Sequence, residues 1–369
     1  MKFLLMRHFA SSLVAYFLTF GNAQSINIPD SVQQKYQKII VLPLILKSIE
    51  TDWSFGGASS YTFRMKPVDS TVRTSNFQAI GLYSIRKQFV SALNGTIFFP
   101  DERYILSQQI SYSYFPDKFW GLGNRSKETD EENYVFKQFY FYPHLQRLIA
   151  NNLYVGVLYE FQRVFGLTYQ AGGIFDTQNV PGRSQYKVSG FGLSFTYDNR
   201  NHAFVPNKGS LAQIIVNNFA PVFGSDFKYT NLVIDTRKYL PVFKDHVLAL
   251  QVYGFFNLGG QIPLRSMSSF GGSNSMRGYY DGRYRDKNQI VFQAEYRATI
   301  KGRFGLAIFG GYGDVGNKMT DFIFTQFKYS YGAGLRVALN KKEKLNIRID
   351  YGIGQGNSRG FYFQIGEAF

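Results

Sequence analysis

The sequence has no cysteine among its 369 residues, which excludes disulfide frameworks, thiolate metal sites and the lipid-modified cysteine of a bacterial lipoprotein. Long apolar runs are also missing. After the first residues, no stretch approaches the roughly 18 apolar residues that a transmembrane helix needs, and the longest, residues 39–46, is interrupted by Pro43. We therefore expect no membrane-spanning helix in the mature chain. A periplasmic protein, a secreted protein and an outer-membrane β-barrel remain as alternatives.

Aromatic side chains and positive charges are abundant instead. The chain has 27 Tyr and 37 Phe, and Lys+Arg exceed Asp+Glu by 41 − 25 = 16. Aromatic residues favour pleated surfaces and membrane–water interfaces. The basic residues are scattered rather than clustered, so the lining of a lumen and contact with anionic lipid head groups explain them better than nucleic-acid binding does. We expect outer-membrane lipids as partners and no nucleic acid.

The first residues are typical of a secretory signal peptide. Lys2 and Arg7 supply positive charge, residues 9–20 form a short and mostly apolar stretch, and residues 21–23 offer small side chains for cleavage. An uncleaved anchor is the alternative, although its apolar stretch is short for a membrane span. The expected organisation is a signal peptide at residues 1–23, a short periplasmic segment at residues 24–38, and one barrel domain at residues 39–369.

Strict alternation of apolar and polar side chains is the main structural signal. Residues 289–299 put Ile290 and Phe292 on one face, and Glu295 and Arg297 on the other. The same alternation occurs in residues 153–162, 188–197 and 345–351. Such alternation indicates strands with one apolar and one polar face.

Strand length favours a membrane barrel over a soluble sandwich. The alternating runs cover about 10–14 residues, whereas sandwich strands usually have about 5–6. Their polar faces mix small and charged residues, as the wet interior of a barrel does. Short turns alternate with long loops, and residues 40–369 accommodate about 16 strands at roughly 20 residues per strand and connection. We predict an all-β fold, a transmembrane antiparallel β-barrel of about 16 strands.

One long loop, residues 259–287, is rich in glycine and tyrosine. Within it, Met276-Arg277-Gly278-Tyr279 resembles the loop-six signature Val/Ile-Arg-Gly-Phe/Tyr of the BamA/TamA family of outer-membrane assembly proteins. Four further motifs are similar to those of the family, mostly within residues 186–369. They are a periplasmic turn (Asp198, Arg200, Pro206, Gly209), a strand motif (Tyr312, Asp314, Gly316), a second strand motif (Gly332, Gly334, Arg336) and a C-terminal strand (Phe361, Phe363, Ile365, Gly366, Phe369).

The resemblance implies that this loop folds into the barrel and that Arg277 bonds there to Asp314. Glycines permit a compact reversal of the chain, and a charge away from water is costly unless it is paired. Tyr312 and Asp314 lie on the same face of an alternating strand as the apolar Leu306 and Ile308. Alternation alone therefore cannot turn Tyr312 and Asp314 inward while the two apolar residues face outward. We expect a β-bulge among Gly310, Gly311 and Gly313 to correct the phase.

The resemblance also implies that the C-terminal strand carries a signal read by the outer-membrane assembly machinery. The alternative is an ordinary lipid-facing strand end. Assembly members of the family carry periplasmic POTRA modules before the barrel, and residues 24–38 are too few for one. The resemblance therefore implies a barrel without POTRA modules.

Two short matches to enzyme motifs carry little weight. Residues 311–316 fit G-x-G-x-x-G, but a dinucleotide site needs a following helix and a strand is expected there. Residues 356–360 fit G-x-S-x-G, but lie between two alternating strands. We expect His144, His202 and His246 in turns or at the barrel rim. The sequence predicts no enzyme, no metal site and no cofactor.

The leading functional hypothesis is assistance to the insertion or translocation of proteins at the outer membrane, through a lateral seam between the first and last strands. Glycines in residues 360–369 and Pro43 in the first strand weaken both sides of this seam, so we expect fewer hydrogen bonds there than between any other strands. Partners would then be outer-membrane protein clients or complex subunits. The alternative is a passive pore or a structural subunit of an outer-membrane complex.

Alternation also predicts which charged residues line the interior, because Arg or Lys facing mid-bilayer lipid costs about 2–4 kcal/mol. The residues expected to face inward are Glu295, Arg297, Arg336, Arg348 and Asp350.

Overall fold

The computed structural model describes residues 38–65, 73–202, 205–340 and 345–369. The predicted signal peptide and all but the last residue of the predicted periplasmic segment lie outside the described residues. Within the described ranges, no helix combines the length and the apolar character that crossing a membrane would require.

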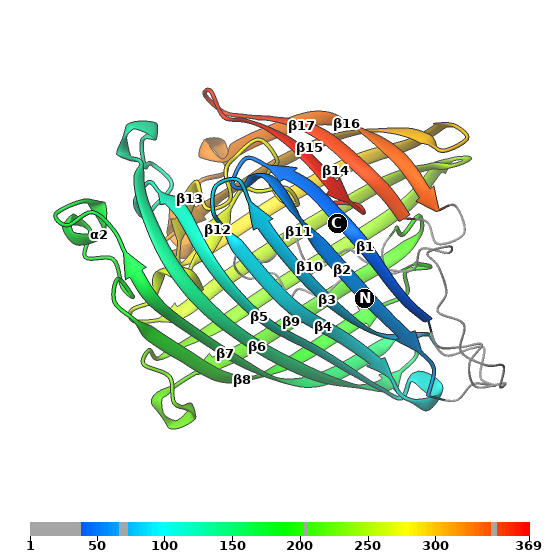
Figure 1. Ribbon diagram of the computed structural model, residues 1–369, viewed down its shortest axis with the longest axis horizontal. Coiled ribbons are helices and arrows are strands. Elements are labelled where there is room, and N and C mark those ends of the chain that lie inside the picture. The colour runs from blue at the N-terminus through cyan, green and yellow to red at the C-terminus, as the bar shows by residue number, and fades with distance from the viewer. Residues whose placement is uncertain (1–37, 66–72, 203–204, 341–344) are drawn as a thin grey trace.

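Sixteen antiparallel strands close into a barrel, which confirms the predicted fold class (Figure 1). Each barrel strand pairs with its neighbours in chain order, except that β11 pairs with β14 and that β18 pairs with β1 to close the barrel. The strands are β1 (Lys38–Ser48), β2 (Asp52–Phe63), β3 (Ser75–Ser84), β4 (Phe89–Phe98), β5 (Tyr104–Phe119), β6 (Glu132–Ala150), β7 (Leu153–Thr168), β8 (Tyr186–Asp198), β9 (Gly209–Phe219), β10 (Tyr229–Phe243), β11 (His246–Gly259), β14 (Asn288–Lys301), β15 (Phe304–Gly316), β16 (Lys328–Asn340), β17 (Leu345–Gly354) and β18 (Arg359–Ile365).

Connections differ in length at the two ends of the barrel, as the alternation of turns and loops predicts. One end has the shorter turns, such as the one at η2 (Pro100–Glu102), and the other has most of the long loops. The loops contain the helical segments α2 (Ile174–Thr177), η3 (Glu128–Asp130), η4 (Pro221–Phe223), η5 (Leu264–Ser266), η6 (Met319–Asp321) and η7 (Phe324–Gln326). The loop between β11 and β14 contains the hairpin β12 (Ser268–Phe270) and β13 (Tyr284–Asp286).

The two faces of the wall have the predicted chemistry over most of the barrel. The five charged residues expected to face inward are all buried, which confirms the predicted register: Glu295, Arg297, Arg336, Arg348 and Asp350. On β8, by contrast, the outward-facing Phe191, Leu193 and Phe195 are more than half exposed. A solvent-shielded polar interior and an exposed apolar exterior are typical of a barrel in a bilayer.

Strand β1 departs from this pattern because both of its faces are apolar. Ile39, Val41 and Ile45 are exposed on the outside, while Leu44 and Leu46 are each only 2% exposed on the inside. The segment that the sequence marks as its longest apolar run is therefore a strand of the wall and is apolar towards the lumen as well as towards the outside.

The predicted bulge in β15 is wrong. The pairing of β15 with β14 runs without a shift from Thr299↔Gly305 to Asn288↔Gly316. Alternation therefore continues in phase and leaves Tyr312 37% exposed on the outer face, so its prediction as an interior residue is also wrong. No bulge is needed because the glycines lie within a regular ladder.

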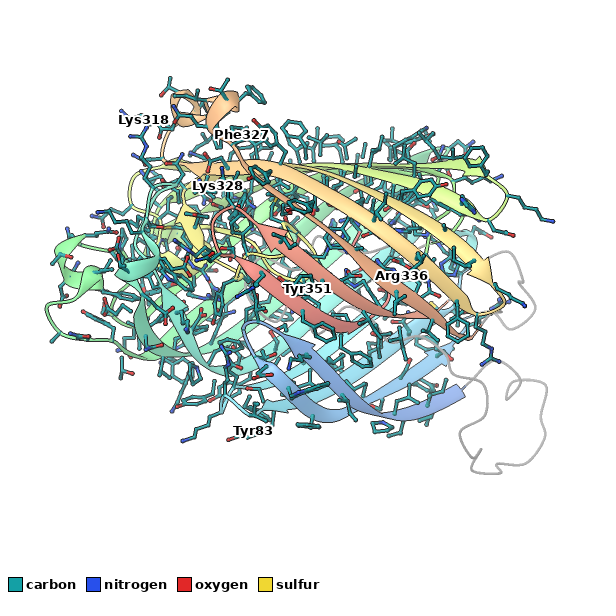
Figure 2. The ribbon with its side chains drawn as sticks, turned by 90° about the horizontal axis from the view of Figure 1, so that it is seen from above. Tyr83, Lys318, Phe327, Lys328, Arg336 and Tyr351 are labelled. Atoms are coloured by element: carbon teal, nitrogen blue, oxygen red, sulfur yellow. The ribbon has the colours of Figure 1, made fainter. Side chains whose placement is uncertain are left out.

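Tyr312 instead holds an outer loop against the barrel wall. Its hydroxyl donates to the carbonyl oxygen of Phe324, and its ring lies 5.3 Å from that of Phe327. The ring of Phe324 lies 6.3 Å from that of Phe292, which faces outward from β14. Figure 2 shows this loop, between β15 and β16, projecting from the barrel near the labelled Phe327. Met319 and Phe324 are 56% and 60% exposed, so the loop presents apolar surface beside the exterior wall.

We expect this loop to enter the membrane, because exposed apolar side chains continuous with an apolar wall favour lipid over water. Phe324→Cys is the chain's only cysteine, so it can be labelled with an environment-sensitive fluorophore. In proteoliposomes its emission should shift to the blue and be quenched by brominated lipid. Thr129→Cys, in the exposed η3 loop, should show neither effect, and equal behaviour of the two labels would disprove membrane contact.

Candidate functional site

The loop between β11 and β14 places Arg277 inside the barrel, where it is 1% exposed. Its guanidinium forms ion pairs with Glu295 of β14 and Asp350 of β17, and lies 3.4 Å from the ring centre of Phe309. Arg277 therefore lies inside the barrel, as the motif implies. The predicted partner is wrong, because the ion pairs of Arg277 are made to these two carboxylates and not to Asp314.

Depth along the wall explains why Asp314 is not the partner. Asp314 lies five positions along β15 from Phe309, the ring against which Arg277 packs, which is roughly 16 Å along a strand. It lies near the long-loop end, where its carboxylate accepts from Lys328 and Asn124, both at 2.8 Å. Gly316, the last residue of the predicted motif, ends β15 and pairs with Asn288.

The ion pairs of Arg277 belong to a larger buried cluster. Asp350 also pairs with Arg336 at 2.5 Å, and Glu295 pairs with Arg297 at 2.6 Å. The cluster continues through Arg336 to Glu367 at 2.8 Å. Buried charges are tolerated only when each is paired and hydrogen-bonded, so the interior of the C-terminal half of the barrel is held by reciprocal pairing.

Glycine is required where the loop meets the wall. Gly278 has φ = +114°, and a Cβ there would lie 2.8 Å from the amide nitrogen of Gly354. On the wall, a Cβ at Gly352 would lie 2.6 Å from the carbonyl group of Arg277. The backbone of the loop therefore lies directly on the backbone of β17, which no residue with a side chain would allow.

The remaining motif residues contact further strands of the same wall. The hydroxyl of Tyr279 donates to the carbonyl oxygen of Tyr329 on β16 at 3.0 Å, and the amide of Gly278 donates to the Tyr362 hydroxyl on β18 at 3.0 Å. The amide of Met276 donates to the Gln293 side chain on β14 at 3.1 Å. One short segment of the loop thus joins β14, β16, β17 and β18.

The barrel closes between β1 and β18, and this junction is the weakest one. Only Lys47↔Phe363 is in register, whereas the least paired of the other junctions, β17 with β18, has seven such pairs. Gln364 adds a side-chain bond to the carbonyl oxygen of Lys47 at 3.1 Å. Among the described residues, the prediction of the weakest pairing at the seam is confirmed.

Half of β1 extends past its partner. β18 ends at Ile365, two residues after Phe363, so the first residues of β1, up to Leu44, reach beyond the end of β18. Pro43 lies in the middle of β1, opposite Gly57 of β2, rather than at the start of the strand. On the seam side, the backbone groups of β1 from Lys38 to Leu44 therefore have no strand partner in the described part of the chain.

The inserted loop also contacts the other side of the seam. The turn between β1 and β2 holds Glu50, which is 2% exposed and accepts the amide hydrogen of Asp281 at 2.8 Å. Three residues earlier in the loop, Gly278 bonds to Tyr362 of β18. The loop therefore spans the junction that the strands themselves pair only once. We call the Glu50–Asp281 contact the clasp.

The clasp brings two acidic side chains near each other. Burial and, to a smaller extent, the nearby Asp281 carboxylate raise the pKa of Glu50 to about 7, while a hydrogen bond from Ser48 opposes both. One oxygen of Glu50 has no hydrogen-bond partner among the described residues. Because the pKa of buried Asp281 is raised as well, ionisation of both carboxylates would place two like charges side by side in the loop–hairpin contact.

The end of the chain turns inward after β18. Phe361 is exposed on the outer face, but Gly366 adopts φ = +85° and Phe369 is only 1% exposed. The carbonyl oxygen of Phe369 accepts from Arg297 at 2.9 Å. Phe363 and Ile365 stay in the strand, so Phe369 is not part of a lipid-facing strand end, and whether this segment acts as an assembly signal remains a prediction.

The turn after β8 is organised by a local ion pair. Arg200 contacts Asp198 through two bonds of 2.8 Å, from its Nε and from one Nη. Gly209 begins β9 with φ = +103°, and Pro206 is buried in the same connection. These four residues shape the connection between two strands and lie outside the Arg277 cluster.

Neither enzyme-like match lies in the context its chemistry needs. Residues 311–316 are part of β15 and are followed by a loop, and residues 356–360 belong to the β17–β18 hairpin. The prediction for His144 is wrong: it lies within β6, 1% exposed, and bonds to Ser194 at 2.7 Å. His202 is in the β8–β9 connection and His246 begins β11.

Sequence reasoning missed Glu50 and Glu367. Glu367 has the same parity as the outward-facing Phe361 and Phe363, and a carboxylate at a lipid-facing position is costly. This conflict could have predicted that the strand ends before Glu367, and β18 does end at Ile365. Nothing in the local sequence distinguishes Glu50 from an ordinary turn residue, because its partner is 231 residues away.

Comparison with known proteins gives a family and a fold. The model of the Omp85 superfamily domain matches residues 19–369. BamA from Haemophilus ducreyi, in a structure that lacks its POTRA domains 1–3, superposes with a TM-score of 0.58 at 14% identity, over 89% of this chain and 70% of that one. CdiB from Acinetobacter baumannii superposes with a TM-score of 0.59 at 12% identity, over 91% of this chain and 66% of that one. CdiB from Escherichia coli gives a TM-score of 0.58 at 11% identity, over 91% and 68%.

Replacing Arg277 by alanine should destabilise the folded barrel, because Glu295 and Asp350 would each lose a buried counter-charge. The expected cost is up to about 3–5 kcal/mol, reduced by the arginines that remain beside them. Arg277→Lys should recover only part of it, since one ammonium cannot replace a planar fork between two carboxylates. The measurement is the temperature at which the folded band is lost on semi-native gels. Arg359→Ala, at an exposed position, is the matched control, and an equal effect would disprove the role of the cluster.

Stability should also depend on the protonation of Glu50. Its folded pKa of about 7 exceeds the ordinary value of 4.5, so the folded protein retains a proton that the unfolded chain releases between these values. Stability is therefore greatest below this window and decreases as the pH rises through about 7. Glu50→Gln, which keeps an acceptor oxygen but cannot ionise, should flatten the melting profile between pH 5 and 8. Glu131→Gln, at an exposed position, should leave it unchanged. A wild-type profile without this decrease would contradict the clasp.

Proposed function

Because the chain belongs to the Omp85 superfamily and forms an outer-membrane β-barrel, we propose that it assists the insertion or translocation of proteins at the outer membrane. In this proposal the exchange of polypeptide takes place at the seam between β1 and β18. The observation that carries it is the single residue pair in register at the closure of an otherwise fully paired wall. No bond is made or broken, so the proposed protein is not an enzyme.

The free edge of β1 supplies the proposed template. An unpaired strand edge presents N–H and C=O groups that a second strand can pair with. In lipid an unsatisfied backbone group costs several kcal/mol, so a client strand that adds to this edge would gain more there than in water. The part of β1 up to Leu44, which extends past the end of β18, is the proposed docking point.

The chemistry of β1 suits a client that is itself a membrane strand. Both faces of β1 are apolar, with Ile39 and Val41 outward and Leu44 and Leu46 inward. A client strand paired to this edge would have apolar surface next to it on either face. The proposed clients are therefore outer-membrane β-strands, with lipids as the second partner of the seam.

The asymmetry of the seam supports opening on one side. β18 belongs to a wall braced by the Arg277 cluster, whereas β1 is held by its pairing to β2 and by the clasp at Glu50. Separation would therefore move β1 with its hairpin away from a fixed β18. The same loop that braces the wall would act as the reversible fastening.

The passive pore is the competing function, and the contents of the lumen argue against it. The loop that carries Arg277 and the inward-turned residues ending at Phe369 both lie within the barrel. A solute path would have to pass these groups while the seam stayed closed. Steady, solute-selective conductance that persists with the seam locked would favour the pore.

A disulfide across the seam should abolish insertion activity and leave the barrel folded. Lys47→Cys with Phe363→Cys links the only residue pair in register, and the cysteine-free chain gives no competing product. The matched control is Ile349→Cys with Phe363→Cys, which places the same cysteine in a bond inside the wall. The measurement is the rate of folding of an outer-membrane β-barrel client into proteoliposomes, before and after reduction.

The two cross-links separate the alternatives. Loss of activity in the seam-locked protein alone, restored by reduction, is the expected result. Full activity in the locked protein would reject lateral opening, and equal loss in both variants would show that the disulfide harms the barrel in a general way.

A further inference from the structure

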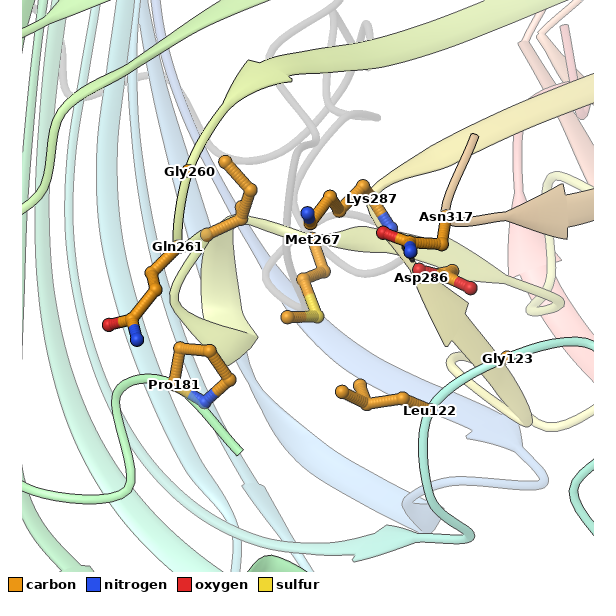
Figure 3. Close-up of a pocket in the computed structure, with 10 residues that line it drawn as sticks. Leu122, Gly123, Pro181, Gly260, Gln261, Met267, Asp286, Lys287 and Asn317 are labelled. Carbon is orange, nitrogen blue, oxygen red and sulfur yellow. Dashed lines mark hydrogen bonds between the residues drawn. The ribbon is translucent and has the colours of Figure 1, made fainter. Parts of the chain in front are cut away.

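Four outer connections of the chain border a partly open cavity of about 300 Å³ at the long-loop end of the barrel (Figure 3). Its apolar lining consists of Leu122, Pro181, Ile262 and Met267. The first comes from the loop after β5, the second from the loop after β7, and the other two from the segment between β11 and β12. The cavity is separate from the seam and from the Arg277 cluster, neither of which contributes a lining residue.

The cavity walls are held in place by backbone bonds between different loops. The amide of Gly123 donates to the carbonyl oxygen of Arg285 at 2.8 Å, and the amide of Leu264 donates to the carbonyl oxygen of Pro181 at 2.9 Å. The Leu122 amide donates to the side chain of Gln178 at 2.7 Å. A pocket built by bonded loops is largely pre-formed, as binding sites for small molecules usually are.

One acidic side chain of this lining forms no ion pair among the described residues. Asp286 is only 9% exposed, and one carboxylate oxygen accepts the amide hydrogen of Lys287 at 2.8 Å. The other oxygen lies on the side of Gly123, 3.9 Å from where a Cβ of that glycine would be. In the part of the chain that the structure describes, Asp286 forms no ion pair. The Lys287 ammonium interacts with this carboxylate electrostatically but forms no ion pair with it. A carboxylate that is nine-tenths buried and not ion-paired is costly, which favours a site completed by a further cation.

We propose that this cavity is an extracellular binding site for a small amphipathic cation, an ammonium group attached to an apolar chain or ring. The apolar body would occupy the space between Leu122 and Met267, and the ammonium would pair with Asp286. Figure 3 shows Leu122 and Met267 beside each other in the middle of the cavity, with Asp286 and Asn317 at one end. The site does not depend on the proposed role of the seam.

The charges around Asp286 define how binding should respond. Burial raises the pKa of Asp286 to about 6, with Asp321 and Asp314 adding to the shift and the Lys287 ammonium and amide opposing it. Binding of a cation should therefore weaken as the pH falls through about 6. Lys287 also lines the cavity and carries the same charge as the ligand, so removing that charge should strengthen binding.

Titration of the whole protein in nanodiscs with 2-phenylethylamine tests the site, since this probe joins a ring to an ammonium. The neutral isostere 2-phenylethanol and the anion 3-phenylpropionate are the matched probes. We expect the amine to bind at least about tenfold more tightly than either, the difference a charge-assisted hydrogen bond supplies. No detectable binding of the amine, or equal binding of amine and alcohol, would overturn the proposal.

Three variants assign the effect to this cavity. Asp286→Asn keeps the shape of the side chain and should reduce amine affinity about tenfold without changing the affinity for the alcohol. Lys287→Gln should increase amine affinity, a result that a merely structural role of the loop would not produce. Met267→Trp should reduce binding of both probes by filling the cavity. Folded yield on semi-native gels is checked for each, and an unchanged amine affinity in both charge variants would place the ligand elsewhere.

Discussion

The structure depends on the pairing of one buried guanidinium with two carboxylates from different strands. Arg277 lies between Glu295 and Asp350, in an interior from which water is largely excluded. Because an unpaired charge there costs several kcal/mol, this pairing strongly favours the observed position of the loop that carries Arg277. In that position the backbone of the loop packs directly on glycines of β17, and the amide of Gly278 donates to the hydroxyl of Tyr362. The pairing therefore fixes the loop, and the loop fixes the C-terminal wall.

The same constraint divides the barrel into unequal sides. The wall from β14 to β18 is joined by strand pairing and by the buried cluster, while β1 meets β18 at a single residue pair. Across the seam there are also the side-chain bond from Gln364 to Lys47 and the clasp between Glu50 and Asp281. In the clasp, a hydrogen bond is opposed by the repulsion between two neighbouring carboxylates. In the proposed mechanism, a contact with this balance would hold the hairpin and be released at small cost. A proposed lateral exchange of polypeptide needs a wall that is rigid on one side and releasable on the other.

The outer end of the barrel combines two further surfaces with different chemistry. The loop between β15 and β16 lies on the exterior wall through Phe324 and Phe327 and presents apolar side chains beside the expected membrane. The connections above the lumen border a cavity whose carboxylate, Asp286, forms no ion pair among the described residues. The apolar loop surface and the cavity both form because long loops at this end pack against the barrel and against each other. This packing holds their apolar and acidic side chains in defined positions.

The sequence by itself determined the class of fold and the direction of most side chains. Alternation has a period of two in any strand, so Glu295 and Asp350 had to share the inward face once the strands were recognised. Glycines and a proline in the terminal strands were enough to predict the weak seam. Only the tertiary structure decided which inward charges meet, because partners such as Arg277 and Asp350 are 73 residues apart and their depth along the barrel depends on the register of every strand between them. For the same reason the family resemblance suggested Asp314 as the partner and an inward Tyr312, although alternation alone placed Tyr312 outward, where the structure has it. Glu50 was left unnoticed because its partner is also distant in the sequence.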